Sequence, residues 1–221
     1  MYTLHAVPDW ASVIVRLVLE EMDLPHEIVL KDAEAGDLDL PAYRRVNPAG
    51  LIPALETPDG PIFETAAILL WLTDRHGALA PPPQSAERAG YLSWLFFTSN
   101  SVHNSVMALV HPERQAGDSG HAEASQIARD TLIHRFGLIE AMLQTGAPPW
   151  LSTREPGALG YYLGTLARWA KLFAANPADA VTLDAFPALR DVLAAHEARP
   201  AALRVARAEG LGPSPFTDPR A

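Results

Sequence analysis

Three consecutive prolines at positions 81–83 divide this sequence into two parts of different character. Proline lacks the amide hydrogen that helices and sheets require, and a run of prolines makes a stiff connection. Before the run, apolar residues alternate between the two-residue spacing of strands and the wider spacing of helices. After it, the two-residue spacing does not recur for long. The sequence therefore predicts two domains, residues 1–80 and 88–221, joined by a proline-rich linker at residues 81–87.

The first domain is predicted to be a mixed α/β unit. Its elements follow the order strand, helix, strand, helix, strand, strand, helix, so a parallel β-α-β arm precedes an antiparallel hairpin. Thr65 and Gly77 are typical residues for the start and the end of the last helix. The expected strands are residues 2–6, 26–30, 54–57 and 61–63, and the other expected helices are residues 10–22 and 41–46.

The second domain is predicted to be all-helical. Long segments with the helical spacing of apolar residues are separated by short stretches rich in glycine and proline. The end of the chain, residues 210–216, contains too much glycine and proline for regular structure, and both packing over a groove and free extension are open. The expected helices are residues 87–110, 121–143, 157–175 and 186–196.

Charge and cysteine content exclude several function classes. Seventeen Lys and Arg residues against twenty-six Asp and Glu residues give a net charge of -9, which repels nucleic acid and anionic membranes. Because there is no cysteine, a protein thiolate, a cysteine zinc site and a CxxC redox centre are excluded. The eight histidines show no compact ligand spacing, so no metal site is expected. No targeting segment is visible at the first residues, and a soluble cytoplasmic protein is expected.

The stretch from Asn47 to Leu55 reads Asn-Pro-Ala-Gly-Leu-Ile-Pro-Ala-Leu and places Pro53 directly before a predicted strand. Proline has no amide to give to a sheet. A cis Ile52–Pro53 bond would turn the chain sharply there and leave the backbone groups of Ile52 facing outward, where an extended peptide could add as one more strand. The alternative is an ordinary trans proline at an edge strand.

Glu64 and Thr65 follow at a strand-to-helix junction. The unpaired amides of the first helical turn and the Thr65 hydroxyl suit a carboxylate, and Glu64 suits an ammonium group beside it. With the turn at Pro53, these residues predict a receptor for a small zwitterionic peptide. Two plainer interpretations stay open: Thr65 as a helix cap alone, and Glu64 as a solvated acid that stabilises the helix dipole.

In this order and spacing, the Asn-Pro-x-Gly-x-Ile-Pro turn at 47–53 and the Glu-Thr-Ala-Ala-Ile motif at 64–68 resemble the glutathione S-transferase superfamily. The proline linker and the helical second half extend the resemblance over the chain, and details at 94–114 and 161–169 are similar to bacterial members. The resemblance implies a thioredoxin-like domain followed by an all-helical domain, usually in a homodimer. It also implies glutathione as co-substrate, held at Ile52, Pro53, Glu64 and Thr65.

The residue that would activate the glutathione thiol does not follow from these motifs. Lowering a thiol pKa by about two units requires about 2.7 kcal/mol of thiolate stabilisation, which one charge-assisted hydrogen bond can supply. Members of the family place Tyr, Ser or Cys after the first strand, but here Ala11 stands where several bacterial relatives carry cysteine. Ser12 is the remaining hydroxyl and our candidate, with capping of its helix as the alternative. His5 is a weaker candidate, and Asp9 would oppose a thiolate beside it.

The predicted helix at 87–110 carries an unusual mixture of aromatic and polar side chains on one side. His103 is a second candidate catalytic residue, and we expect its neighbours to contact the second substrate, while a core role for the aromatic pair is the alternative. Tyr161, Tyr162 and Trp169 are expected only to pack. The expected substrate contacts are Trp94, Phe97, Asn100 and Asn104.

Two functions remain from the sequence. The first is a glutathione transferase, active in detoxification, that promotes attack of the glutathione thiolate on a small apolar electrophile by conjugation or peroxide reduction. The second is a non-catalytic glutathione-binding or scaffold protein with a transferase-like fold. The missing standard activator after the first strand favours the second.

Overall fold

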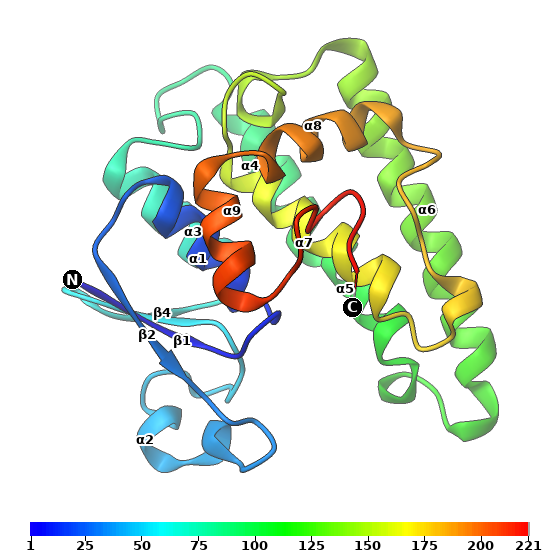
Figure 1. The fold of residues 1–221 in the computed structure, drawn as a ribbon, viewed down its shortest axis with the longest axis horizontal. Coiled ribbons are helices and arrows are strands. Elements are labelled where there is room, and N and C mark those ends of the chain that lie inside the picture. The colour runs from blue at the N-terminus through cyan, green and yellow to red at the C-terminus, as the bar shows by residue number, and fades with distance from the viewer. Residues whose placement is uncertain (221) are drawn as a thin grey trace.

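The computed structural model describes residues 1–220, and its first part is built on a four-stranded mixed sheet (Figure 1). The strands are β1 (Tyr2–Ala6), β2 (His26–Leu30), β3 (Ala54–Thr57) and β4 (Gly60–Phe63), in the spatial order β2-β1-β3-β4. β1 pairs with β2 in parallel, with Leu4 opposite Ile28, and β1 pairs with β3 in antiparallel, with Leu4 opposite Leu55. β3 and β4 form the predicted antiparallel hairpin, and β4 begins one residue earlier than predicted.

Two helices cover one face of this sheet, α1 (Ser12–Glu21) and α3 (Thr65–His76), while α2 (Pro41–Arg44) lies on the other side (Figure 1). α1 starts two residues later and ends one residue earlier than predicted, and α2 is two residues shorter. Glu64, not Thr65, occupies the N-cap position of α3, so the predicted capping role of Thr65 is wrong. Gly77 ends α3 in the left-handed conformation, as predicted. A short 3-10 turn, η1 (Asp37–Asp39), precedes α2.

The second part is helical. Residues 77–87 connect α3 to α4 (Arg88–Phe97), which continues through the π-helical segment η2 (Thr98–His103) into α5 (Asn104–Val110). The sequence predicted one uninterrupted helix here, and a π segment is invisible to a pattern of apolar spacing. The other long helices are α6 (His121–Gly146), α7 (Ala158–Leu172), α8 (Pro187–Glu197) and α9 (Pro200–Glu209), of which α9 was not predicted. Short 3-10 turns lie between them: η3 (Pro112–Arg114), η4 (Asp118–Gly120), η5 (Pro149–Leu151) and η6 (Pro177–Asp179).

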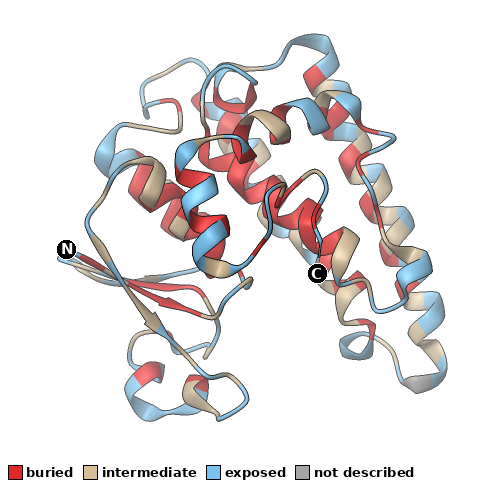
Figure 2. Ribbon diagram, in the orientation of Figure 1, coloured by how far each residue is buried: buried red, intermediate tan, exposed pale blue. Residues whose placement is uncertain are grey.

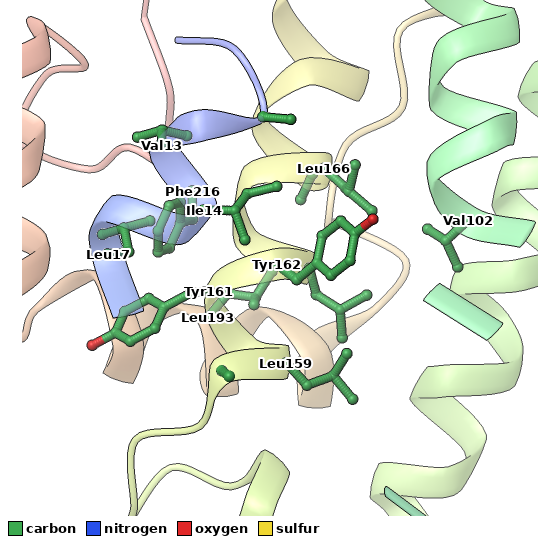
Figure 3. Packing of buried hydrophobic residues seen from close by; sticks show 14 of the residues in the cluster. Val13, Ile14, Leu17, Val102, Leu159, Tyr161, Tyr162, Leu166, Leu193 and Phe216 are labelled. Atoms are coloured by element: carbon green, nitrogen blue, oxygen red, sulfur yellow. The ribbon is translucent and has the colours of Figure 1, made fainter. Parts of the chain in front are cut away.

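Helix α7 is the centre of the molecule, and every residue from Ala158 to Ala170 is buried (Figure 2). Its neighbours include α1 of the sheet domain, so one apolar core runs through both parts of the chain. Figure 3 shows Tyr161 pointing toward α1 and Tyr162 pointing to the opposite side of α7. The Tyr161 hydroxyl donates to Glu21 Oε2 at 2.5 Å, which joins α7 to the end of α1. The two domains therefore pack as a continuous body.

The start of α7 lacks a capping side chain, because Gly157 is its N-cap residue. A histidine of α8 holds this N-cap residue in place: Nε2 of His196 accepts from the Gly157 amide at 3.0 Å, and its Nδ1 donates to the Val192 carbonyl at 2.8 Å. A Cβ on Gly160 would lie 2.2 Å from His196 Nε2, so glycine is required there. Burial lowers the pKa of His196, which keeps the ring neutral for this role.

The tail of the chain packs against the helices. Phe216 is buried against Gly164 of α7, and the Glu197 carboxylate accepts from the amides of Phe216 and Thr217 at 2.8 and 3.0 Å. Of the two open alternatives, the structure excludes free extension: the tail packs on the helices, and none of its residues lines the cleft between the domains. Within residues 1–220, no helix combines the length and the apolar content needed to cross a bilayer.

Candidate functional site

A cleft of about 730 Å³ lies where the two domains meet, within the usual size range of small-molecule sites. One wall comes from the sheet domain and consists of the β1–α1 loop, the turn before β3 and the junction of β4 with α3. The other wall comes from η2, α5, η3 and α7. The first wall is called the sheet wall below, and the second is called the helical wall.

The turn before β3 is held by two buried side chains that converge on one carbonyl. The Tyr43 hydroxyl donates to the Leu51 carbonyl at 2.6 Å, and Asn47 Nδ2 donates to the same oxygen at 2.7 Å. Asn47 Oδ1 also accepts from the Ala49 amide at 3.0 Å. Burial raises the pKa of Tyr43 to about 12, so its hydroxyl keeps its proton at neutral pH. These contacts fix the chain just before Ile52.

The Ile52–Pro53 peptide bond is cis, as predicted. Both residues line the cleft, and the backbone groups of Ile52 make no hydrogen bond to any other part of residues 1–220. They are therefore available to an extended peptide in the cleft.

Glu64 and Thr65 line the same end of the cleft. Glu64 is exposed and adopts φ 71° and ψ 118°, which turns the chain from β4 into α3. Thr65 is buried to 6% exposure as the first residue of α3, where the helical amides have no partner inside the helix. The structure thus brings together all four residues that the sequence assigned to glutathione binding.

Ser12 does not line the cleft. It is fully buried, its hydroxyl donates to the Val7 carbonyl at 3.0 Å, and the Val7 amide donates back to it at 3.3 Å. Ala11 occupies the N-cap position of α1, so Ser12 does not cap the helix either. His5 is also away from the cleft, with Nε2 2.7 Å from Glu56 Oε1.

Asp9, in the β1–α1 loop, has a left-handed backbone with φ 56°. The helical domain binds each of its polar groups, in a set of contacts called the Asp9 clamp below. Arg168 of α7 grips the carboxylate with Nε at 2.9 and 3.0 Å and with a terminal nitrogen at 2.8 Å. Trp169 Nε1 donates to the Asp9 carbonyl at 3.0 Å, and the Asp9 amide donates to Glu209 of α9 at 3.0 Å. The carboxylate charge is therefore neutralised by Arg168.

The clamp presents the next two residues of the loop to the cleft. Trp10 is 45% exposed and Ala11 lines the cleft beside it. The amide of Ala11 makes no hydrogen bond within residues 1–220. A free amide at the start of α1 can receive negative charge.

On the helical wall, the structure separates the expected substrate contacts into two groups. Asn100, His103 and Asn104 line the cleft. Trp94 and Phe97 do not line it; they pack edge to face at 5.3 Å between ring centres, against the core. Tyr162 and Trp169, expected only to pack, both line the cleft as well. Their helix was predicted, but nothing in its apolar spacing marks which buried residues reach a site.

His103 and Tyr162 form a hydrogen-bonded pair. Nδ1 of His103 lies 2.8 Å from the Tyr162 hydroxyl, and the two rings meet edge to face. Burial lowers the pKa of His103 to about 4, so the imidazole is neutral at pH 7. Burial raises the pKa of Tyr162, which the hydroxyls of Ser99 and Thr65 counteract in part. Tyr162 thus joins His103 to the Thr65 end of the sheet wall.

No group of three or more His, Asp or Glu side chains in residues 1–220 is arranged to hold a metal ion.

The family described as "Glutathione S-transferase, N-terminal domain" matches residues 12–75. The uncharacterized GST-like protein YncG of Escherichia coli strain K12 is 30% identical over 174 residues, which cover 76% of this chain and 82% of YncG. The chain belongs to the glutathione S-transferase superfamily.

Other similar members of the superfamily differ in their reactions. The maleylacetoacetate isomerase of Pseudomonas aeruginosa is 27% identical over 209 residues, 90% of this chain and 92% of that protein. A solved glutathione transferase from Burkholderia graminis is 25% identical, with a TM-score of 0.78 over 96% of this chain and 89% of that one. It holds two glutathione molecules per subunit. These two relatives are superfamily enzymes. The predicted thioredoxin-like domain with an all-helical domain is confirmed as the fold.

Proposed function

We propose that this protein is a glutathione transferase that binds glutathione in the cleft and promotes attack of its thiolate on a small apolar electrophile, by conjugation or peroxide reduction. The observation that carries the proposal is the meeting of Ile52, Pro53, Glu64 and Thr65 at one end of a cleft whose opposite wall presents His103. Glutathione bound to superfamily relatives supports it.

Each end of the tripeptide has a matching group on the sheet wall. The free amides at the start of α3 and the Thr65 hydroxyl suit the γ-glutamyl carboxylate, and Glu64 suits the neighbouring ammonium. The backbone groups of Ile52 can pair with the cysteinyl residue as an added strand. This arrangement directs the sulfur toward the β1–α1 loop and the helical wall.

The thiolate needs a donor other than Ser12, whose hydroxyl hydrogen is already given to Val7. We assign this role to His103 together with the free amide of Ala11. When Tyr162 donates to Nδ1 of the neutral ring, Nε2 carries the hydrogen, and no residue of the described chain accepts it. In conjugation the thiol proton goes to solvent, the sulfur forms a bond to carbon, and the leaving group departs with the bond electrons.

The test measures glutathione affinity by calorimetry, bound thiolate by ultraviolet absorbance, and turnover with a panel of electrophiles. Because one charge-assisted hydrogen bond is worth about 1.5–3 kcal/mol, His103→Gln should lower turnover by about 10- to 100-fold and leave glutathione affinity within about threefold. Ser12→Ala is the matched control and should keep the thiolate absorbance. Full turnover in His103→Gln rejects the assignment, and absence of glutathione binding to the wild type rejects the function.

A second function is favoured by one observation: the cleft offers no free hydroxyl at the start of α1, since Ser12 is buried. The protein would then be a glutathione-binding or scaffold protein without catalysis. Glutathione binding with no thiolate absorbance, and no turnover over the whole panel, would support it.

The assembly and setting of the protein belong to the same proposal. By its similarity to the superfamily, we expect a homodimer that acts in the cytoplasm in detoxification, with no nucleic acid, membrane or metal as partner. The net charge of -9 supports the exclusion of polyanions. Sedimentation velocity at micromolar concentration measures the oligomeric state directly.

A further inference from the structure

The cleft extends beyond the part that glutathione would fill. Along the helical wall, Ser99 and Val110 both line it; they are eleven positions apart, which corresponds to at most about 16 Å because part of this stretch is the wider π-helical segment η2. An extended tripeptide spans about 10 Å, and the γ-linkage of glutathione adds about 2 to 3 Å. With its γ-glutamyl end at Thr65, beside Tyr162 and Ser99, glutathione leaves the end near Val110 free for the second substrate.

The free end has large apolar side chains on both walls. Trp10 contributes from the β1–α1 loop with 45% of its surface exposed, and Phe173, just after α7, is 40% exposed. Met107 and Val110 of α5 line the same cleft. Exposed large apolar side chains inside a cleft indicate a surface that a ligand covers. The aromatic rings of Trp10 and Phe173 favour an aromatic ligand, because aromatic rings attract one another by stacking or edge-to-face contact.

One charged side chain at this end makes no ion pair. Arg114, in η3, is exposed, lines the cleft and lies within ion-pair distance of no carboxylate among the side chains that the structure describes. The neighbouring Glu113 does not line the cleft, and its carboxylate lies 2.9 Å from Nδ1 of His111. Asp9, an acid of the cleft lining, is already held by Arg168. A guanidinium without an ion pair beside an apolar surface suits a carboxylate, which it can bind through two parallel hydrogen bonds.

We propose that Arg114 selects electrophiles that carry a carboxylate on an aromatic body. This narrows the second substrate of the proposed transferase, on which it rests, from a small apolar electrophile to an anionic one. The aromatic ring lies between Trp10 and Phe173, the carboxylate meets Arg114, and the reactive carbon faces the sulfur near His103. With a chloroarene as electrophile, sulfur bonds to the ring carbon, chloride leaves with the electron pair, and the carboxylate is unchanged.

The kinetic test compares two chlorodinitroarenes that differ only by a carboxylate, 2-chloro-1,3-dinitrobenzene and 4-chloro-3,5-dinitrobenzoate. Arg114→Gln should lower kcat/KM for the benzoate by about 10- to 100-fold and change that for the uncharged compound by less than about threefold. Arg114→Lys should recover part of the loss. The matched control is Arg190→Gln, an exposed arginine of α8 outside the cleft lining, which should change neither value. An unchanged ratio between the two substrates in Arg114→Gln overturns the proposal.

A binding measurement separates this proposal from the transferase function. Calorimetry with unreactive 3,5-dinitrobenzoate should show binding to the wild type that weakens at least about tenfold in Arg114→Gln and not in Arg190→Gln. If the protein conjugates the uncharged arene but binds dinitrobenzoate equally with and without Arg114, the transferase stands and the selection by Arg114 fails. If dinitrobenzoate binds through Arg114 while glutathione does not bind, the anion site stands and the transferase function fails.

Discussion

The two walls of the cleft are built in different ways. The sheet wall is made largely of backbone: the cis bond before Pro53, the turn at Glu64 and the free amides at the start of α3. The helical wall is made of side chains from segments far apart in the sequence, such as His103 and Tyr162. A backbone wall is set by a few local residues and binds a constant ligand, whereas a side-chain wall can change its ligand by substitution. The common tripeptide and the variable second substrate therefore belong on different walls.

The Asp9 clamp is where the two walls depend on each other, and Arg168→Met should break it with the largest effect. Both side chains are mostly buried, at 4% and 20% exposure, so removing one leaves an unpaired charge. We expect the free energy of unfolding in urea to fall by about 3–5 kcal/mol. Turnover should also fall, because the loop that carries Trp10 and Ala11 is no longer held by the Asp9 clamp. The affinity for glutathione, which is bound at the Glu64 end of the cleft, should stay within about threefold.

The control for this variant is Arg204→Met, which removes an ion pair of α9 with Glu20 whose arginine is 53% exposed. Exposed pairs contribute about 0–1 kcal/mol, so this loss should be small. Equal losses in the two variants would show that the clamp adds nothing beyond a surface pair.

A second prediction concerns the helical wall and acid. The pKa of His103 is lowered from 6.5 to about 4 in the folded protein, so the unfolded chain binds more protons between these values. The stability due to neutral His103 is complete above pH 6.5 and is lost as the pH falls toward 4, by at most about 3 kcal/mol. Because His196 acts in the same direction, the measurement is the difference between wild type and His103→Gln in urea unfolding from pH 4 to pH 7.5. Parallel plots of unfolding free energy against pH for the two proteins would contradict the predicted contribution of His103.

The smallest effect is expected on the sheet wall. Tyr43→Phe removes one of two hydrogen bonds to the Leu51 carbonyl, and Asn47 still donates to the same oxygen. Stability should fall by about 1 kcal/mol, and the glutathione dissociation constant measured by calorimetry should rise less than about threefold. A tenfold weaker affinity for glutathione would mean that the turn depends on a single side chain. This would contradict the view that the sheet wall is made largely of backbone.

The same contrast explains what the sequence could predict. The strands at 2–6, 26–30 and 54–57, the cis bond at Pro53 and the approach of Glu64 to Ile52 follow from local spacing and from residues with special backbone properties. The cap of α3 was misplaced by one residue, because Glu64 takes a left-handed backbone that its residue type does not announce.

The helical wall was harder to predict, because its residues are chosen by packing between distant helices. The spacing along α4, η2 and the start of α5 gives Trp94, Phe97, Asn100 and Asn104 similar standing, but Trp94 and Phe97 pack against the core. Ser12 has the residue type of a thiol activator, yet the Val7 carbonyl takes its hydrogen. The sequence around Asp9 does not indicate its partners, which lie 159 residues away at Arg168 and 200 residues away at Glu209.

The Asp9 clamp also limits how this chain can be recombined with its relatives. A chimera that joins the first 80 residues to the helical half of a relative would contain Asp9 without Arg168, Trp169 and Glu209. The loop that bears Trp10 would then lose its shape, even if each half folded correctly. In the design of a chimera, residue 9 should therefore come from the same parent protein as the helical half, although it lies in the first half of the sequence. The β1–α1 loop thus depends on the helical half for its shape, although the run of prolines separates the two in the sequence.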